Sequence, residues 1–464
     1  MDMRRWMAAA LAGLVAAGAG AQMAGGRSAG APPAFDQAET LSPVAPAVLP
    51  LREQARIRDG WLRERLDRLV PALMRENKVD MWILVAREYA EDPVLSTMLD
   101  AESFHARRRT ILVFFDPGQG RPVERFTVSR YGLAGLFEAA WKPETQPDQW
   151  QRLAEIVRER RPRRIAVNVS PASAFGDGLT KSQYDELAAA LGDDAKRIVP
   201  AGALAINWLE TRTPAEMARY PEIVRLAHAI IAQGFSTQAV TPGRTTAADL
   251  VWWYRERIAG LKLATWFQPS VAIFRRGSGG LGGNEVIRSG DMLWVDFGIT
   301  YMGLNTDTQH LAYVLRPGER AAPQGLRDGL AAANGVQDAV TGAYRTGLTG
   351  NQILAAARSA AIAKGLRPTI YSHPIGYHGH AAGSAIGFWD DQQPSPRGDH
   401  PVRPMTAWSI ELLAMHKVPE WGGQDVPFRL EEDAWFDGRQ VRYIDGRQTR
   451  FHLIGAPAGG RRRR

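Results

Sequence analysis

The stretch Asp296-Phe-Gly-Ile-Thr-Tyr-Met-Gly-Leu-Asn-Thr-Asp307 lies between two apolar runs, at residues 292–295 and 311–315. Short apolar runs separated by a glycine-containing segment predict two strands joined by a turn. An antiparallel hairpin can bring both carboxylates to the same end of a sheet, although each could instead only cap a turn. Asp296-Phe-Gly also matches the metal-binding tripeptide of protein kinases. No catalytic His-Arg-Asp segment and no glycine loop followed by a lysine strand precede it, which excludes that class.

A group of histidines follows about seventy residues later. Three of the nine histidines fall within eight positions among glycines, namely His373, His378 and His380. A single histidine more often has a structural role, whereas three together favour metal binding or catalysis.

Two further apolar segments contain carboxylates. Residues 405–414 read as a strand with Glu411 inside it, and residues 428–436 read as another with Glu431. An unpaired carboxylate among buried apolar neighbours is costly, so Glu411 requires a cation nearby. Arg429 could supply that charge as a plain ion-pair partner.

The composition limits what the chain can be. Its 464 residues correspond to two or three domains, with a hydrophobic fraction of 45% and a charged fraction of 23%. These values exclude a mainly disordered chain, a collagen and a polytopic membrane protein. Because the chain has no cysteine, thiol nucleophiles, disulfides and cysteine-bound zinc are excluded, and any metal must be held by His, Asp or Glu.

The net charge of +8 includes four arginines at the end of the chain, Arg461 to Arg464. The charge on the rest is too weak to indicate nucleic-acid binding. We read residues 456–464 as a solvated basic tail.

The N-terminus has the pattern of an export signal. Arg4 and Arg5 precede an apolar run that ends near Ala19-Gly-Ala21. The run is too short and too rich in Gly and Ala for a stable membrane span. We therefore expect a cleavable signal peptide at residues 1–21, an irregular Pro- and Ala-rich leader at 22–50, and a periplasmic or secreted protein.

Residues 51–205 alternate between predicted helices and strands, which is typical of an α/β domain. The pattern predicts a long helix over 51–77, strands at 81–86, 110–115 and 164–169, and helices over 149–160 and 181–191. No group of chemically active residues occurs here, so we expect a structural or oligomerising domain.

A second unit begins at Thr213-Pro-Ala-Glu216, a capping box that predicts a helix to about residue 233, kinked or restarted at Pro221. Residues 242–250 and 346–354 form a faint internal repeat at an offset of 104. Each leads into a predicted helix, as expected for a half-domain duplicated once.

Together these residues resemble the pita-bread metallopeptidases, which include methionine aminopeptidase, aminopeptidase P and prolidase. The likeness covers about residues 213–455. The matching residues, in family order, are Asp296, Asp307, His380, Glu411 and Glu431. His380 matches the Gly-His-x-x-Gly segment through Gly383. The resemblance implies an α+β chain, with a C-terminal pita-bread domain after an α/β domain like the N-terminal domain of creatinase and aminopeptidase P.

The resemblance also implies two divalent metal ions. Four carboxylates around one imidazole repel one another unless cations balance them. In the family the equivalents of Asp307 and Glu431 bridge both ions, that of Asp296 completes one ion, and those of His380 and Glu411 complete the other. Oxygen-rich ligation favours manganese, with zinc, cobalt and iron open. Glu411 is the expected general base for the bridging water.

The sequence departs from the family at two histidines that bind substrate or donate a proton. Residues 275–284 contain none, and the position seven after His380 is Gly387. We therefore expect His373 and His378 to act as catalytic substitutes, with His378 also open as the ligand in place of His380.

Three functions follow from the sequence. The first is an exported dinuclear metallopeptidase of the Xaa-Pro aminopeptidase or dipeptidase type that acts on short peptides. The alternative is a metal-dependent non-peptidase on the same scaffold, a small-molecule C–N hydrolase or lyase, and the third is a non-catalytic binding protein. The resemblance implies a homodimer or a higher homo-oligomer.

Overall fold

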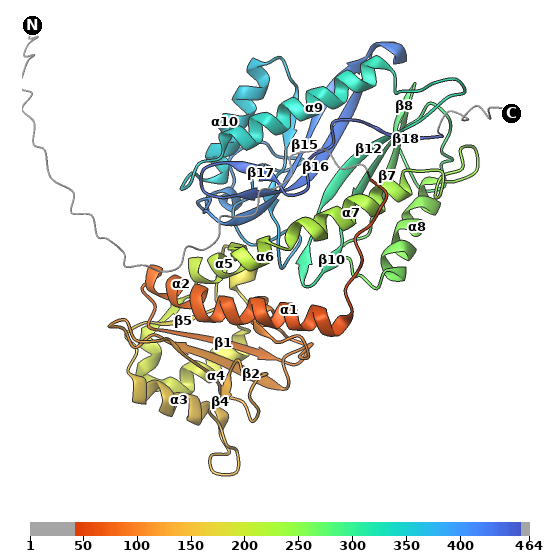
Figure 1. Ribbon diagram of the computed structural model, residues 1–464. Helices are drawn as coiled ribbons and strands as arrows, with labels where there is room; N and C mark the ends of the chain where they lie inside the picture. The colour runs from red at the N-terminus through yellow and green to blue at the C-terminus, as the bar shows by residue number, and fades with distance from the viewer. Residues whose placement is uncertain (1–41, 456–464) are drawn as a thin grey trace, which may run out of the picture.

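The computed structural model describes residues 42–455 (Figure 1). The expected signal peptide, the leader up to residue 41 and the basic tail lie outside these residues. Within residues 42–455, no helix is both long enough and apolar enough to cross a membrane.

The N-terminal part is built on a six-stranded sheet in the order β4-β3-β2-β1-β5-β6. Central strand β1 (Met81–Arg87) is antiparallel to β2 (Arg109–Phe115) and parallel to β5 (Ile165–Val167). Alternate residues of β1 enter two separate hydrophobic cores, which explains its unbroken apolar run. The other strands are β3 (Glu124–Thr127), β4 (Glu138–Ala139) and β6 (Ile198–Pro200).

Helices cover both faces of this sheet, as the α/β pattern predicts (Figure 1). One core includes α3 (Gln149–Arg160) and α4 (Lys181–Leu191). The other includes α2 (Val70–Glu76) and α5 (Ala203–Glu210). The predicted helix at 51–77 is confirmed as α1 (Leu51–Glu64), a π-helical turn (Arg65–Leu69) and α2.

The C-terminal part is built on a large sheet with the central order β13-β15-β16-β12-β9-β7-β8. The predicted hairpin is confirmed: β9 (Met292–Phe297) pairs antiparallel with β12 (Thr308–Val314). The longest pair is β15 (Thr406–Val418) with β16 (Gln424–Phe436). The remaining strands of the sheet are β7 (Ser270–Arg275), β8 (Ser278–Leu281), β13 (Pro368–Ile370), β14 (His373–Pro374), β17 (Val441–Tyr443) and β18 (His452–Ile454).

Two helix pairs pack on this sheet, α7 (Tyr220–Gly234) with α8 (Ala247–Gly260), and α9 (Gln324–Ala343) with α10 (Gly350–Ala363) (Figure 1). Both α8 and α10 begin at a capping box, at Thr246 and Thr349. This supports the predicted repeat, although the two threonines are 103 positions apart rather than 104. The expected helix after Thr213 is interrupted: α6 (Pro214–Met217) ends and α7 begins at Tyr220, with Pro221, which lacks the amide hydrogen that a continuous helix needs, in its first turn.

A buried ion cluster joins the two parts. Glu216, at the start of α6, lies 3.2 Å from Arg65 Nη1 and 3.6 Å from Arg212 Nη1, and all three side chains are fully buried. Tyr377 also donates its hydroxyl hydrogen to Glu216. Burial raises the pKa of Glu216, but the two arginines outweigh it and hold the pKa below its usual value.

Replacing Glu216 by alanine is expected to destabilise the protein by about 3–5 kcal/mol, because it leaves two buried guanidinium groups without their carboxylate. Urea unfolding measures this change. The exposed pair Arg219–Glu222 provides the matched control, and Glu222→Ala is expected to cost at most about 1 kcal/mol. Equal small losses in both variants would contradict a structural role for the buried cluster.

Candidate metal centre

Strand register places three predicted carboxylates in one row across the sheet. Gln309 on β12 lies opposite Asp296 on β9 and opposite Glu431 on β16, and Glu431 lies opposite Glu411 on β15. Directly opposed residues project from the same face of a sheet. The side chains of Asp296, Gln309, Glu431 and Glu411 therefore stand side by side across four adjacent strands.

Asp307 and His373 complete this group. Asp307 directly precedes β12, two positions before Gln309. Nε2 of His373 lies 3.6 Å from Asp307 Oδ2, 3.6 Å from Glu431 Oε1 and 3.8 Å from Glu411 Oε2. We call Asp296, Asp307, His373, Glu411 and Glu431 the front centre.

The tautomer of His373 bears on what the front centre can bind. Nδ1 lies 3.0 Å from the carbonyl oxygen of Pro374, which can only accept a hydrogen bond. The neutral ring therefore carries its hydrogen on Nδ1 and turns the Nε2 lone pair towards three carboxylates. Nε2 has no hydrogen-bond partner, nor do Oδ1 of Asp296 and Oδ1 of Asp307. A lone pair facing buried carboxylates is unfavourable unless a cation or a proton lies between them.

The pKa values of the carboxyl groups reflect this crowding. Burial, followed by the charge of Glu431, raises the pKa of Asp296, Asp307 and Glu411 well above the usual values. The donor atoms of Asp296, Asp307 and Glu431 lie within 4.8 Å of one another, as do those of His373, Glu411 and Glu431. Two overlapping ligand sets that share Glu431 are suited to two adjacent cations.

Four neighbouring side chains that the sequence analysis missed hold the carboxylates in place. Oε1 of Glu411 accepts hydrogen bonds from Gln309 Nε2 (2.6 Å) and Trp389 Nε1 (3.1 Å). Ser409 donates to Glu431, and Asp433 accepts from the backbone N–H of Asp307 at 3.3 Å. Strand alternation could have identified three of the four, because Gln309, Ser409 and Asp433 each lie two positions from a predicted ligand.

His380 was predicted to be the imidazole ligand, but the structure places His373 in the central position among the carboxylates and His380 at its side. Strand β14 pairs with β15 so that His373 lies opposite Ser409, two residues before Glu411. The ring of His380 stands beside that of His373, 4.7 Å away at 88°, and its donor atom lies within 4.8 Å of Asp307. His373 also has a glycine at +3, Gly376, and His380 is the residue seven positions after it. The second histidine expected from the family pattern is therefore present.

The structure places His378, for which a catalytic role was predicted, away from the front centre. Its ring packs against Phe175 of the N-terminal part, 4.8 Å away, and it does not belong to any of the ligand groups found in residues 42–455. Burial lowers its pKa. Gly379 and the turn around it direct residues 378 and 380 to different neighbours.

Arg429 does not form the plain ion pair considered from the sequence. Its guanidinium lies over the rings of Trp294 and Trp389, at 5.1 and 5.7 Å. This places a cation near Glu411 and Asp296 without occupying their oxygens, and burial lowers its pKa.

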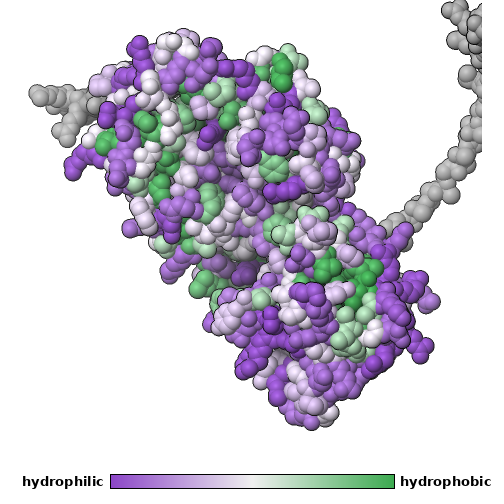
Figure 2. All heavy atoms as spheres, turned by 180° about the vertical axis from the view of Figure 1, so that it is seen from behind, coloured by the Kyte–Doolittle hydropathy of each residue, from purple (hydrophilic) through white to green (hydrophobic). Residues whose placement is uncertain are grey.

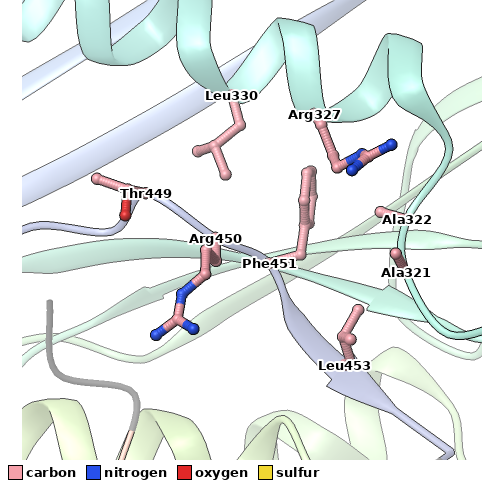
Figure 3. Close-up of a pocket in the computed structure, with 8 residues that line it drawn as sticks. All are labelled: Ala321, Ala322, Arg327, Leu330, Thr449, Arg450, Phe451 and Leu453. Atoms are coloured by element: carbon pink, nitrogen blue, oxygen red, sulfur yellow. The ribbon is translucent and has the colours of Figure 1, made fainter.

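Hydrophilic side chains cover most of the face in Figure 2, with hydrophobic ones in small groups. The cavity in Figure 3, about 460 Å³ in volume, is lined by residues such as Ala322 and Leu330 near α9 and Phe451 and Leu453 near β18. It shares no residue with the front centre.

Without metal, the protein is expected to lose stability as the pH rises. Because folding raises the pKa of Asp296, Asp307 and Glu411, their contribution is fully present below the unfolded pKa of about 4 and is lost as the pH passes through the raised folded values. Urea unfolding in a chelator at about pH 5 and about pH 8 measures this loss. Asp307→Asn should show a smaller loss, and an equal loss would contradict the explanation.

The chain is similar to known proteins in sequence and in fold. Residues 222–435 match the family model "Metallopeptidase family M24". The X-Pro aminopeptidase of Thermotoga maritima MSB8 has 15% identity and a TM-score of 0.59, with 82% of this chain and 100% of that chain covered. The Xaa-Pro dipeptidase of Bacillus anthracis has 18% identity and a TM-score of 0.55, with 88% and 100% covered. No curated protein matches the sequence. Residues 222–435 are therefore similar to metallopeptidase family M24, and the chain has the pita-bread fold of these solved structures.

Proposed function

We propose that the chain is a dinuclear-metal peptidase of the Xaa-Pro type, which cleaves short peptides with proline in the second position. The main support is the front centre, four carboxylates and one imidazole gathered within an M24 domain. Similar folds are named as an X-Pro aminopeptidase and an Xaa-Pro dipeptidase.

The residues present fit two divalent ions. Asp296 would hold one ion and His373 with Glu411 the other, while Asp307 and Glu431 lie close enough to both sets to bridge them. The unpartnered oxygens of Asp296 and Asp307 and the bare Nε2 of His373 are the donor atoms such ions would take. An oxygen-rich set with one imidazole favours manganese. When bound, the ions polarise the scissile carbonyl and make water a better nucleophile.

Glu411 is suited to accept the proton of the attacking water. Its Oε1 is held by Gln309 and Trp389, so that Oε2 remains on the side of His373 and the other carboxylates. A fixed orientation leaves one defined oxygen as general base.

His380 is the second group proposed to act on the substrate. Burial, then the neighbouring His373, lowers its pKa to about 4. The ring is therefore neutral near pH 7 and keeps one N–H to donate to the substrate oxygen as charge develops there.

A panel of proline peptides tests the proposal. Manganese-loaded protein should release the first residue from Xaa-Pro-Xaa tripeptides or split Xaa-Pro dipeptides, and Xaa-Ala analogues should be cut more slowly. The ratio of dipeptide to tripeptide turnover separates dipeptidase from aminopeptidase. Bound metal without peptide turnover would reject the proposal, and absence of bound metal would favour a non-catalytic protein.

The alternative, a small-molecule C–N hydrolase or lyase on the same scaffold, retains one supporting observation. Residues 275–284 contain no histidine, so one substrate-binding group expected for proline peptides is missing. The peptide panel therefore includes simple amides without proline.

Export of the protein is proposed from residues 1–21 alone. Mature protein beginning near residue 22 in the periplasm or medium, identified by N-terminal sequencing, would support it.

A further inference from the structure

A second cluster of histidines and carboxylates lies behind the front centre. It consists of His228 on α7, His310 on β12, Glu432 on β16, Asp445 after β17 and His452 on β18. We call it the rear cluster. Glu432 directly follows Glu431, and adjacent strand residues point to opposite faces of a sheet. The rear cluster is therefore separate from the front centre, although one strand supplies both.

The inner atoms of the rear cluster form a compact donor set. Oε2 of Glu432 lies 3.2 Å from Nε2 of His228, and Oε1 lies 3.1 Å from Nε2 of His310. All three side chains are buried, with at most 2% exposed. Two imidazole nitrogens and the two oxygens of one carboxylate provide four ligands, a number and a chemistry that Zn²⁺ accepts.

The other nitrogen of each histidine is held by an outer partner. Nδ1 of His228 lies 3.0 Å from Oδ2 of Asp445, whose second oxygen accepts from Arg225. Nδ1 of His310 lies 3.1 Å from Nε2 of His452. Metal-binding histidines generally donate their second N–H in this way, which directs the Nε2 lone pair towards the ion.

The inner atoms are only partly satisfied as a hydrogen-bond network, since Oε1 of Glu432 is hydrogen-bonded to His310 and to the backbone N–H of Gln448 but Oε2 has no such partner. His228 Nε2 and Glu432 Oε2 are 3.2 Å apart, but neither makes a correctly directed hydrogen bond. The two carboxylates, Glu432 and Asp445, carry two negative charges. Arg225 balances the charge of Asp445, so either one extra proton on a histidine or one divalent ion would balance Glu432. Two nearby donor atoms that do not point at each other favour an ion between them.

We propose that the rear cluster is a buried structural zinc site, with His228, His310 and Glu432 as ligands and Asp445 and His452 as outer partners. The ion would fasten α7 to β12, which directly follows Asp307, and to β16, which carries Glu431. Since no ligand is accessible to solvent, the ion would enter during folding and leave only on unfolding.

The test uses the full chain, produced with zinc in the medium. A chelator under native conditions removes accessible ions from the front centre, after which elemental analysis counts the zinc that remains. About one zinc ion per chain should be retained and released only in denaturant. Zinc-free protein that is folded, and whose melting temperature after refolding is the same with and without zinc, would overturn the proposal in favour of a protonated histidine.

Variants locate the retained ion. His310→Gln should lose it, and Asp445→Asn should weaken binding about 10- to 100-fold. Two controls should retain it: Asp307→Asn in the front centre, and His416→Gln on β15 outside both clusters. Loss of the retained zinc in Asp307→Asn, or retention in His310→Gln, would overturn the proposal. If His310→Gln does not fold, the visible absorption of wild-type protein refolded with Co²⁺ decides, because tetrahedral coordination gives an intense band that a six-coordinate ion lacks.

Discussion

His373→Ala should lower kcat/KM by more than about 100-fold and reduce bound manganese, since losing even an outer partner of a ligand typically costs 10- to 100-fold. Nε2 of His373 is the only imidazole nitrogen within 4 Å of three front-centre carboxylates in residues 42–455. Its removal leaves Asp307, Glu411 and Glu431 without their nitrogen partner. Peptide turnover and metal content, measured together, check the prediction.

His378→Ala is the matched comparison. Its ring lies against Phe175 and not among the carboxylates, so metal content should be unchanged and kcat/KM should fall by less than about tenfold. The two variants remove the same group from positions five residues apart, one on β14 and one after it. Equal losses would show that this segment responds as a whole and that His373 has no separate role.

The sequence was sufficient to predict the carboxylates. Asp296 and Asp307 flank a hairpin whose strands are apolar runs, and Glu411 and Glu431 interrupt similar runs. A buried strand allows a carboxylate only where something compensates its charge. Because side chains alternate between the two faces of a strand, the alternation determines the face on which each carboxylate lies. The strand register then places the carboxylates of separate motifs in one row across the sheet.

The choice of histidine could not be made from the local pattern. Both His373 and His380 have a glycine three positions later, so the His-x-x-Gly part of the motif fits twice, although only His380 also follows a glycine. Gly383 is required for another reason: a Cβ there would lie 2.6 Å from the Pro374 side chain. What selects His373 is its pairing with Ser409 on β15, a contact between residues 36 positions apart. Such long-range register is set by the packing of the whole sheet and is not visible within a short motif.

The second large effect is expected for Glu411→Gln, which should reduce kcat by about 10²- to 10⁴-fold while the fold is kept. The amide has nearly the shape of the carboxylate and can still accept from Gln309 and Trp389 through its oxygen. It cannot take a proton from water near neutral pH. The surface variant Glu256→Gln on α8 controls for the loss of one negative charge and should retain full activity.

The stability of the metal-free protein distinguishes the loss of a general base at Glu411 from a loss of packing. In metal-free protein Glu411 is buried beside Glu431, and both burial and that charge raise its pKa, so ionised Glu411 opposes folding at neutral pH. Neutral glutamine removes the repulsion. The metal-free Glu411→Gln variant should therefore unfold at higher urea concentration than metal-free wild type, while its activity with manganese is lost. A variant that loses both activity and metal-free stability would instead have lost its packing, and Glu411 would not be assigned as the base.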